Sequence, residues 1–310
     1  MKMGNCRQAY GETLRDLGET DKNIVVLEAD LGKSTMSYMF NEKYPQRYFQ
    51  AGIAEQNMAG MAAGLALTGK TAFINSFAVF ASGRAYDQIR SAICVAGLNV
   101  KICGSSCGLS DYGDGKTHQS VDDIALMRVI PKMTVLSPVD SVETAQMVQA
   151  MCKTKGPCYI RIHRSDIPIF TDPSEEYHIG KMGQIRSGTD VVVFATGVMV
   201  SQALIAADEL EKEGISVRIV NVSTIKPLDR KALDKYCAGV KGVVTSEEHS
   251  IYGGLGSAIC EALSYSRLPI EIHGINDMFG RSSDNYELLQ EKYNLTPEGV
   301  AEKIKKVLNA

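Results

Sequence analysis

Short apolar runs alternate with segments of helical periodicity along the whole chain. In the first half, the apolar runs occupy residues 24–29, 71–75, 100–103, 134–136 and 158–162. Between them, apolar positions recur at helical spacing in residues 6–17, 55–67, 81–96, 120–129 and 141–152. Strands that are apolar on both faces and alternate with helices are typical of a parallel sheet covered by helices on both sides. The pattern therefore predicts an α/β fold.

The same alternation resumes in the second half after an irregular stretch. Residues 164–188 contain prolines, a run of acidic residues and several glycines, which is typical of a linker. Beyond it, strands are predicted at residues 190–196, 217–222, 242–247 and 270–275, and helices at residues 200–213, 229–238, 254–264 and 297–308. We therefore expect two α/β domains, each a mainly parallel sheet with helices on both faces, at residues 1–170 and 188–310, with a linker at residues 171–187.

Composition and charge exclude several classes of protein. The chain has 310 residues and a net charge of −3 without a basic stripe, which argues against nucleic-acid binding. No stretch reaches the roughly 18 apolar residues of a membrane span, and the first residues lack the apolar core of a signal peptide. The eight cysteines form no CxxC pair, which favours free thiols over a zinc site. We expect a cytoplasmic protein that binds no membrane.

The segment Gly113-Asp114-Gly115 resembles the start of the motif with which thiamine-diphosphate enzymes hold a metal ion and a diphosphate. That motif also needs an asparagine roughly 25 to 30 residues later, because aspartate and asparagine oxygens both ligate the Mg²⁺ ion. The sequence contains no asparagine between Gly115 and Asn221. The match therefore fails, and we expect no metal site in this chain.

A carboxylate, Glu55, stands at the start of a predicted helix whose body is almost wholly small and apolar. From its position alone, the favoured interpretation is that Glu55 complements the helix dipole, an effect of about 0.3–1 kcal/mol when exposed. A resemblance over most of the chain changes that interpretation. Six segments, in order, resemble the pyrimidine-binding and C-terminal domains of transketolase: residues 6–11, 33–35, 53–58, 76–80, 84–90 and 225–230.

The transketolase domain that holds the diphosphate motif has no counterpart here, so the chain resembles the C-terminal subunit of a transketolase split into two chains. The resemblance implies thiamine diphosphate as cofactor, and Mg²⁺ (or Ca²⁺ or Mn²⁺) ligated by an N-terminal partner subunit. It also implies an α2β2 assembly and the transfer of a two-carbon ketol unit from a ketose to an aldose. Carbanion chemistry of this kind belongs to the cofactor, which the protein orients.

The resemblance also assigns cofactor-binding residues. Glu55 would hydrogen-bond the N1′ nitrogen of the aminopyrimidine and so act in catalysis, while Phe77 and Phe80 would pack around the ring. Asp30 and Ile53 fall on two further cofactor-contacting positions. The role of Arg84 stays open, because its spacing from the phenylalanines is one residue longer than in animal transketolases.

A second set of residues is implied for the sugar substrate. Arg7, Ser34 and Arg164 match phosphate ligands, although Arg7 could be a surface residue and Arg164 could pair with the nearby Asp166. Asp114 would contact a sugar hydroxyl. His118 matches a position near the reacting carbons, where a histidine can move a proton.

One substrate position departs from the family pattern. Transketolases commonly have a histidine that helps to hold phosphate where this chain has Ser106, and Tyr112 nearby is also unusual. The acceptor could therefore be a sulfonated sugar, another sugar phosphate or a less charged aldehyde.

Two other functions stay open at this point. One is the β subunit of a 2-oxo-acid dehydrogenase E1, which shares the domain order and the glutamate but has no need of the sugar-phosphate residues. The other is a non-catalytic partner that retained the fold. No ligand is assigned to the segment 247–256, whose glycine-rich helix start is weak evidence for an anion site.

Overall fold

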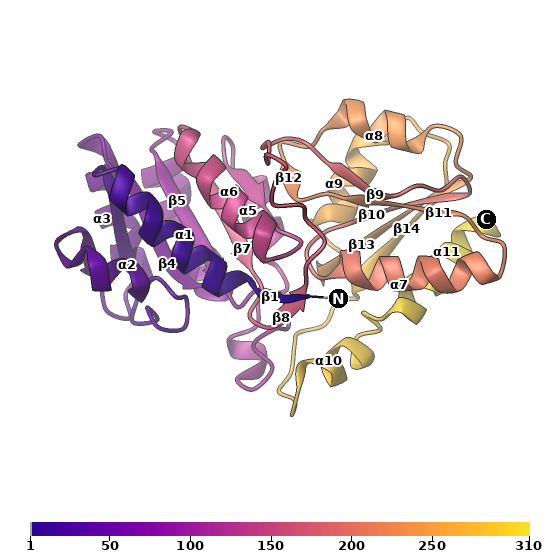
Figure 1. Ribbon diagram of the computed structural model, residues 1–310, viewed down its shortest axis with the longest axis horizontal. Helices are drawn as coiled ribbons and strands as arrows, with labels where there is room; N and C mark the ends of the chain where they lie inside the picture. Colours follow the sequence, from indigo (N-terminus) through magenta and orange to yellow (C-terminus); the bar gives the residue numbers. More distant parts are fainter. Residues whose placement is uncertain (1) are drawn as a thin grey trace.

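Seven strands form the sheet of the first domain in the computed structural model, which describes residues 2–310 (Figure 1). The strand order is β12-β6-β7-β5-β4-β2-β3, and all neighbouring pairs are parallel except β12 with β6. The strands are β2 (Ile24–Glu28), β3 (Tyr48–Gln50), β4 (Thr71–Phe77), β5 (Val100–Ser105), β6 (Thr134–Leu136), β7 (Cys158–Ile162) and β12 (Thr224–Lys226).

Alternate residues of these strands enter two different cores. Val26 and Phe73 face α1 (Cys6–Thr20) and α6 (Ser141–Lys153), whereas Leu27 and Ile74 face α3 (Glu55–Leu67) and α5 (Asp123–Val129). Five-residue strands such as β2 are buried at every position. This double burial explains why the strands read as continuous apolar runs instead of alternating ones.

The predicted helix at residues 81–96 is wrong in its detail. The segment consists of two π-helical turns, η2 (Phe80–Arg84) and η3 (Ile89–Cys94), on either side of a short α4 (Tyr86–Gln88). Ser82 helps to explain this departure from a regular helix. Its Oγ donates to the carbonyl of Ala78 at 2.7 Å, and such a side-chain bond to the preceding turn bends helices. The next predicted helix begins at Asp123 instead of residue 120, since Ser120 forms a β-bridge with Gly108.

The second sheet has the order β14-β13-β10-β11-β9, and only β9 is antiparallel to its neighbour. Its strands are β9 (Gly183–Arg186), β10 (Val191–Ala195), β11 (Val217–Asn221), β13 (Gly242–Ser250) and β14 (Ile270–Ile275). The helices are α7 (Met199–Lys212), α8 (Arg230–Cys237), α9 (Leu255–Ala262), α10 (Tyr286–Lys292) and α11 (Pro297–Leu308). The expected pair of α/β domains with mainly parallel sheets is confirmed.

Two short strand pairings lie at the centre of the molecule, and one of them joins the two domains (Figure 1). β12 comes from the second half of the sequence but pairs with β6 of the first sheet. β1 (Met3–Asn5) pairs antiparallel with β8 (Asp166–Pro168), which brings the start of α1 beside the end of β7. Residues 183–186, within the predicted linker, form β9. The remaining short elements are α2 (Tyr38–Lys43), η1 (Pro45–Arg47) and η4 (Gly115–Thr117).

Candidate functional site

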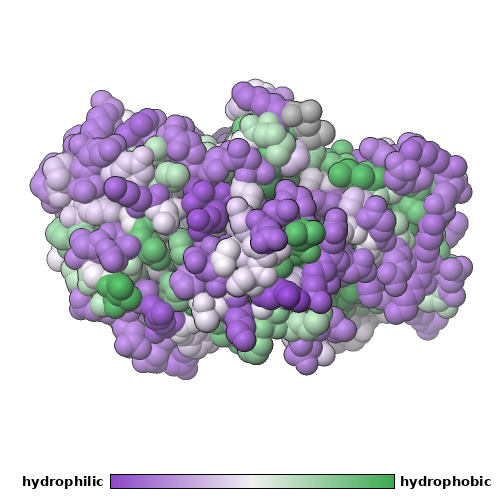
Figure 2. All heavy atoms as spheres, turned by 90° about the horizontal axis from the view of Figure 1, so that it is seen from below, coloured by the Kyte–Doolittle hydropathy of each residue, from purple (hydrophilic) through white to green (hydrophobic). Residues whose placement is uncertain are grey.

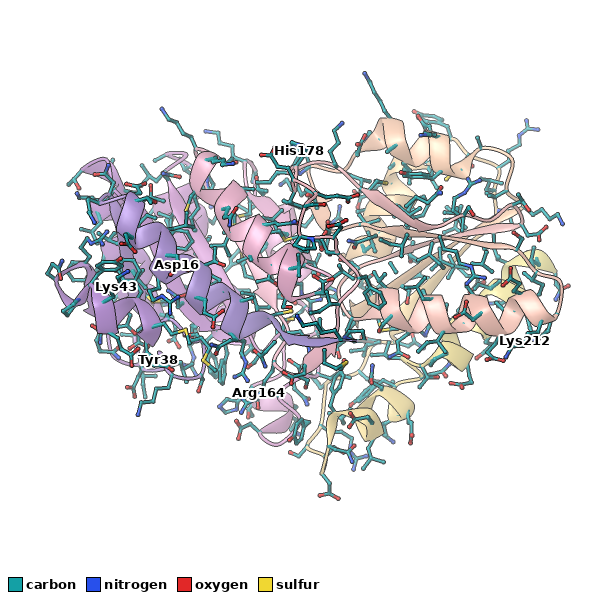
Figure 3. All side chains as sticks on the ribbon, viewed as in Figure 1. Asp16, Tyr38, Lys43, Arg164, His178 and Lys212 are labelled. Atoms are coloured by element: carbon teal, nitrogen blue, oxygen red, sulfur yellow. The ribbon has the colours of Figure 1, made fainter. Side chains whose placement is uncertain are left out.

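The predicted site residues gather at one edge of the first sheet. The carboxyl ends of parallel strands lie at the same edge of a sheet, so the loops after β2, β3, β4, β5 and β7 meet there. Arg164 and Tyr38 mark this edge on the lower side of the first domain in Figure 3. From below, the molecule presents a mostly hydrophilic face with isolated apolar patches (Figure 2). The loops, together with the end of β4 and the starts of α3 and η2, contain the predicted site residues Asp30, Ser34, Ile53, Glu55, Phe77, Phe80, Ser106, Asp114, His118 and Arg164.

Glu55 begins helix α3 and is 3% exposed. Its two carboxylate oxygens accept hydrogen bonds from Nη1 of Arg84 at 3.2 and 3.3 Å. The preceding residue, Ala54, supplies no side-chain cap, so the free N–H groups of the helix start also favour a negative charge at this position. Glu55 is therefore a buried hydrogen-bond acceptor with one half-exposed partner.

Three aromatic rings are linked to this carboxylate through Arg84. The rings of Phe77 and Phe80 are nearly parallel, with centroids 6.1 Å apart, and the His118 ring meets Phe80 edge-on at 5.3 Å. Arg84 connects the two parts, because its Cζ lies 4.0 Å from the centre of the Phe80 ring. A buried acceptor next to apolar ring faces suits a flat heteroaromatic group such as an aminopyrimidine. The residues present therefore fit the pyrimidine end of thiamine diphosphate.

The two arginines predicted to bind an anion lie close to each other. Nη1 of Arg7 donates to the backbone carbonyl of Ser34 at 2.9 Å, and its Nε is buried without a partner in residues 2–310. Burial and the neighbouring charge of Arg164 both lower the pKa of Arg7. The pairing of β1 with β8 explains the proximity, because it places the start of α1 next to Arg164.

Arg164 pairs with a residue that the sequence interpretation did not single out. Its Nη1 donates to Oδ2 of Asp111 at 2.8 Å, while Asp166 accepts a hydrogen bond from Nδ2 of Asn5 instead. Burial raises the pKa of Asp111, and Arg164 opposes that rise. The sequence shows an acidic residue in the loop between Ser106 and Asp114. Sequence alone does not show which arginine that residue would contact.

The loop after β5 carries three further residues that are predicted to bind the substrate. Ser106 has a left-handed backbone with φ of 52°, and its Oγ is buried without a hydrogen-bond partner in the described chain. Asp114 is exposed, and His118 is half-buried, with its Nδ1 2.9 Å from Oγ1 of Thr117. Gln119 holds the loop, since its Nε2 donates to the carbonyls of Leu109, Asp111 and Arg281.

Asp30 and Ile53 are exposed residues at the same edge of the first sheet. Asp30 is exposed with φ of 59°, and its N–H donates to Oε1 of Gln50 at 3.0 Å. Ile53 is 74% exposed. A cavity of about 540 Å³ opens between these loops, lined by Glu28, Asp30, Ser34, Tyr48 and Gln50 among others.

Among residues 2–310, no group of three or more histidine, cysteine, aspartate or glutamate side chains could hold a metal ion. All eight cysteines are free in the structure. In the same part of the chain, no helix is both long enough and apolar enough to cross a bilayer.

Comparison with known proteins places these features in a family. The transketolase pyrimidine-binding domain matches residues 2–169, and the transketolase C-terminal domain matches residues 180–300. A putative transketolase C-terminal section of Methanocaldococcus jannaschii is 45% identical over 302 residues, covering 96% of this chain and 94% of that protein. The 6-deoxy-6-sulfo-D-fructose transketolase subunit SqwH of a Clostridium species is 39% identical over 95% of this chain and 91% of its own length.

Further relatives agree with this assignment. One of the subunits of the apulose-4-phosphate transketolase of Phocaeicola vulgatus is 34% identical, over 95% of each chain. A solved split-gene transketolase, described as an inactive β4 tetramer, superposes with a TM-score of 0.91 at 43% identity over 99% of both chains. The chain therefore belongs to the transketolase family and corresponds to its pyrimidine-binding and C-terminal domains, the C-terminal section of a split transketolase.

Proposed function

We propose that this chain is the C-terminal subunit of a thiamine-diphosphate-dependent transketolase that moves a two-carbon ketol unit from a ketose to an aldose. The observation that carries the proposal is the buried carboxylate of Glu55, which is linked through Arg84 to the ring of Phe80 and its neighbours Phe77 and His118. When bound, thiamine diphosphate supplies the nucleophilic carbon and the electron sink for breaking and forming a carbon–carbon bond next to a carbonyl.

Glu55 is proposed to share a proton with the N1′ nitrogen of the pyrimidine, with Phe77 and Phe80 stacked against the ring and Asp30 and Ile53 at its border. The burial of Glu55 supports this role, because a shared proton is held best where water is excluded. Arg84 must then give up at least part of its contact with the carboxylate, and its half-exposed side chain has room to do so.

His118 is proposed to move a proton to or from a substrate hydroxyl, since it projects beside the same rings. Arg7, Ser34, Ser106 and Arg164 would hold the charged end of the sugar. Asp114 would accept a hydrogen bond from a sugar hydroxyl. The Clostridium relative is named for a sulfonated ketose and the Phocaeicola relative for a sugar phosphate, so an anionic sugar is the supported substrate class.

The diphosphate and its Mg²⁺ (or Ca²⁺ or Mn²⁺) ion are proposed to bind the N-terminal partner subunit, in an α2β2 assembly. The surface of α3 supports such a contact. In residues 2–310, nothing outside the helix's own backbone lies within 4 Å of where a Cβ of Gly60 or Gly64 would be. Ile53, two residues before the helix, and Leu67, its last residue, are each 74% exposed. The description of the homologous β4 tetramer as inactive also supports a need for a partner.

A reconstitution experiment tests the proposal. The chain is combined with an N-terminal subunit, and ketose cleavage is followed by the release of an aldose, with pyruvate and branched 2-oxo acids as alternative donors. We expect turnover of a ketose, a fall in kcat of about 10²–10⁴-fold in Glu55→Gln, and little change in Gln56→Ala, an exposed neighbour. Decarboxylation of an oxo acid, or full activity of Glu55→Gln, would reject the proposal.

Calorimetry adds a readout that does not depend on turnover. The isolated chain should bind thiamine diphosphate poorly and the reconstituted complex should bind it well. Tight, magnesium-dependent binding by the isolated chain would contradict the division of the site between two subunits.

A further inference from the structure

The carboxylate of Asp111 is bound to an arginine that the proposed function reserves for the substrate. Nη1 of Arg164 donates to Oδ2 of Asp111 at 2.8 Å. The aspartate side chain is 4% exposed and the arginine side chain 36% exposed, so the arginine faces the open edge while the carboxylate lies beneath it. The proposed function assigns no role to Asp111.

Hydrogen bonds within the surrounding loops hold the backbones of Asp111 and Arg164. The backbone carbonyl of Asp111 accepts hydrogen bonds from the N–H of Gly115 and from Nε2 of Gln119, both at 3.2 Å. The backbone N–H of Arg164 donates to Oγ of Ser110, the residue before Asp111, at 3.3 Å. The backbones of both residues are therefore held in place, with the buried carboxylate beneath the arginine.

Asp111 reduces the positive charge that the predicted anion site presents. Arg7 and Arg164 supply two positive charges at the end of the pocket, and the buried carboxylate cancels one of them. Four exposed charges on these loops, Lys33, Asp114, Lys116 and Asp166, sum to zero and are screened by solvent. The site therefore offers about one net positive charge to the end of a sugar.

Ser106 adds no charge that could replace the one that Asp111 cancels. It is fully buried, and its Oγ has no hydrogen-bond partner in residues 2–310. A free hydroxyl of this kind can donate one hydrogen bond to an anionic oxygen, but it does not neutralise a second negative charge.

We propose that Asp111 is a specificity-determining residue that makes this subunit select a sugar whose distal end is singly charged, as in a sulfonate, over one that ends in a phosphate dianion. A phosphate monoester has a second pKa near 6 and carries close to two negative charges at neutral pH, whereas a sulfonate carries one. A fixed carboxylate repels the second charge, which is discrimination through an unfavourable contact. This inference rests on the proposed transketolase function.

The test compares two ketose donors of the same carbon skeleton in the reconstituted enzyme, 6-deoxy-6-sulfofructose and fructose 6-phosphate. At pH 7.5 we expect kcat/KM to favour the sulfonate by about tenfold or more, the size expected from one unpaired like charge in a partly desolvated site. Asp111→Asn keeps the shape of the side chain and should lower that ratio by about tenfold. Asp166→Asn, the control at an exposed aspartate two residues after Arg164 that pairs with Asn5 instead, should leave the ratio unchanged.

The wild-type enzyme provides a second arm that needs no variant. Lowering the pH from 7.5 to 5.5 converts the phosphate ester largely to its monoanion, while the sulfonate keeps its charge. The preference for the sulfonate should therefore shrink at pH 5.5, because the ratio of two donors cancels pH effects that they share. A preference that does not change between these pH values would overturn the proposal.

Other outcomes separate this inference from the proposed function. Ketose turnover that favours the phosphate, or that accepts uncharged fructose as well as the sulfonate, rejects the role of Asp111 and leaves transketolase activity intact. If no ketose is turned over, NMR titration of the chain with methanesulfonate and methyl phosphate still decides the charge preference. Weaker binding of methyl phosphate at pH 7.5, reversed in Asp111→Asn, supports the role, and equal binding rejects it.

Discussion

Nη1 of Arg84 lies within hydrogen-bond distance of both carboxylate oxygens of Glu55, at 3.2 and 3.3 Å. The two residues are 29 positions apart, and the π-helical turn η2 ends at the arginine. The contact therefore depends on the shape of the segment after β4. It gives the buried carboxylate a counter-ion in the absence of cofactor.

Arg84→Met should destabilise the isolated chain, because it leaves the carboxylate of Glu55 buried without its charged partner. We expect a loss of about 1–2 kcal/mol in the free energy of unfolding, less than for a fully buried pair since Arg84 is half-exposed. Urea denaturation measures it. In a double-mutant cycle with Glu55→Gln the two losses should be less than additive, and full additivity would show that the contact contributes nothing.

The ion pair of Arg161 with Asp123 should contribute far more to stability. Nε and Nη2 of Arg161 donate to the two carboxylate oxygens at 2.9 and 3.0 Å, and both side chains are buried. Asp123→Asn leaves an uncompensated buried arginine, so we expect a loss of about 3–5 kcal/mol in denaturation experiments.

The pair of Arg128 with Glu261 is the control, because two nitrogens of its guanidinium also donate to both carboxylate oxygens, and its glutamate is 60% exposed. Glu261→Gln should cost less than about 1 kcal/mol. Equal losses in the two variants would contradict the importance of burial.

Two glutamates at the contact between the domains should make stability depend on pH. Burial raises the pKa of Glu143 and of Glu248 to about 7. Between pH 4.5 and 7 the folded chain holds protons that the unfolded chain releases, so these groups make stability fall as the pH rises through that window. The effect is of the order of 3 kcal/mol for each group, and Glu248→Gln should flatten the profile by about that amount in denaturation series across this range.

The prediction is tested by comparing the variant with the wild type, because His163 changes the pH dependence of stability in the opposite direction. Burial lowers its pKa to about 4, so its contribution to stability is lost as the pH falls from 6.5 to 4. A Glu248→Gln variant with the same pH profile as wild type would show that this carboxyl is not protonated in the folded chain.

The thiols should react slowly in the native protein. Burial raises the pKa of Cys6, Cys103 and Cys152 to about 12 and that of Cys94 and Cys237 to about 11, so very little thiolate is present at pH 8. We expect a thiol-specific dye to label mainly Cys260, which is only partly buried, and all eight cysteines after denaturation. Rapid labelling of further thiols in the native state would contradict their burial.

The sequence was sufficient to predict the main elements, because strands such as β2 are buried on both faces and therefore uniformly apolar. It placed Glu55 at the start of a helix, where the structure has it. It could not show that Arg84 meets Glu55 or that Asp111 meets Arg164. Such pairs depend on how loops separated by tens of residues approach each other at the sheet edge, and no local periodicity encodes that approach.

The edge strand β12 has a consequence for folding during synthesis. The first sheet ends in a strand formed by Thr224–Lys226, beyond β9, β10 and β11 of the other sheet. A ribosome that has released only residues 1–187 therefore exposes β6 with unpaired backbone groups, an open template for pairing with another chain. The amino-terminal half lacks the edge strand of its own sheet. Nascent chains can therefore pair wrongly with one another until residues 224–226 emerge.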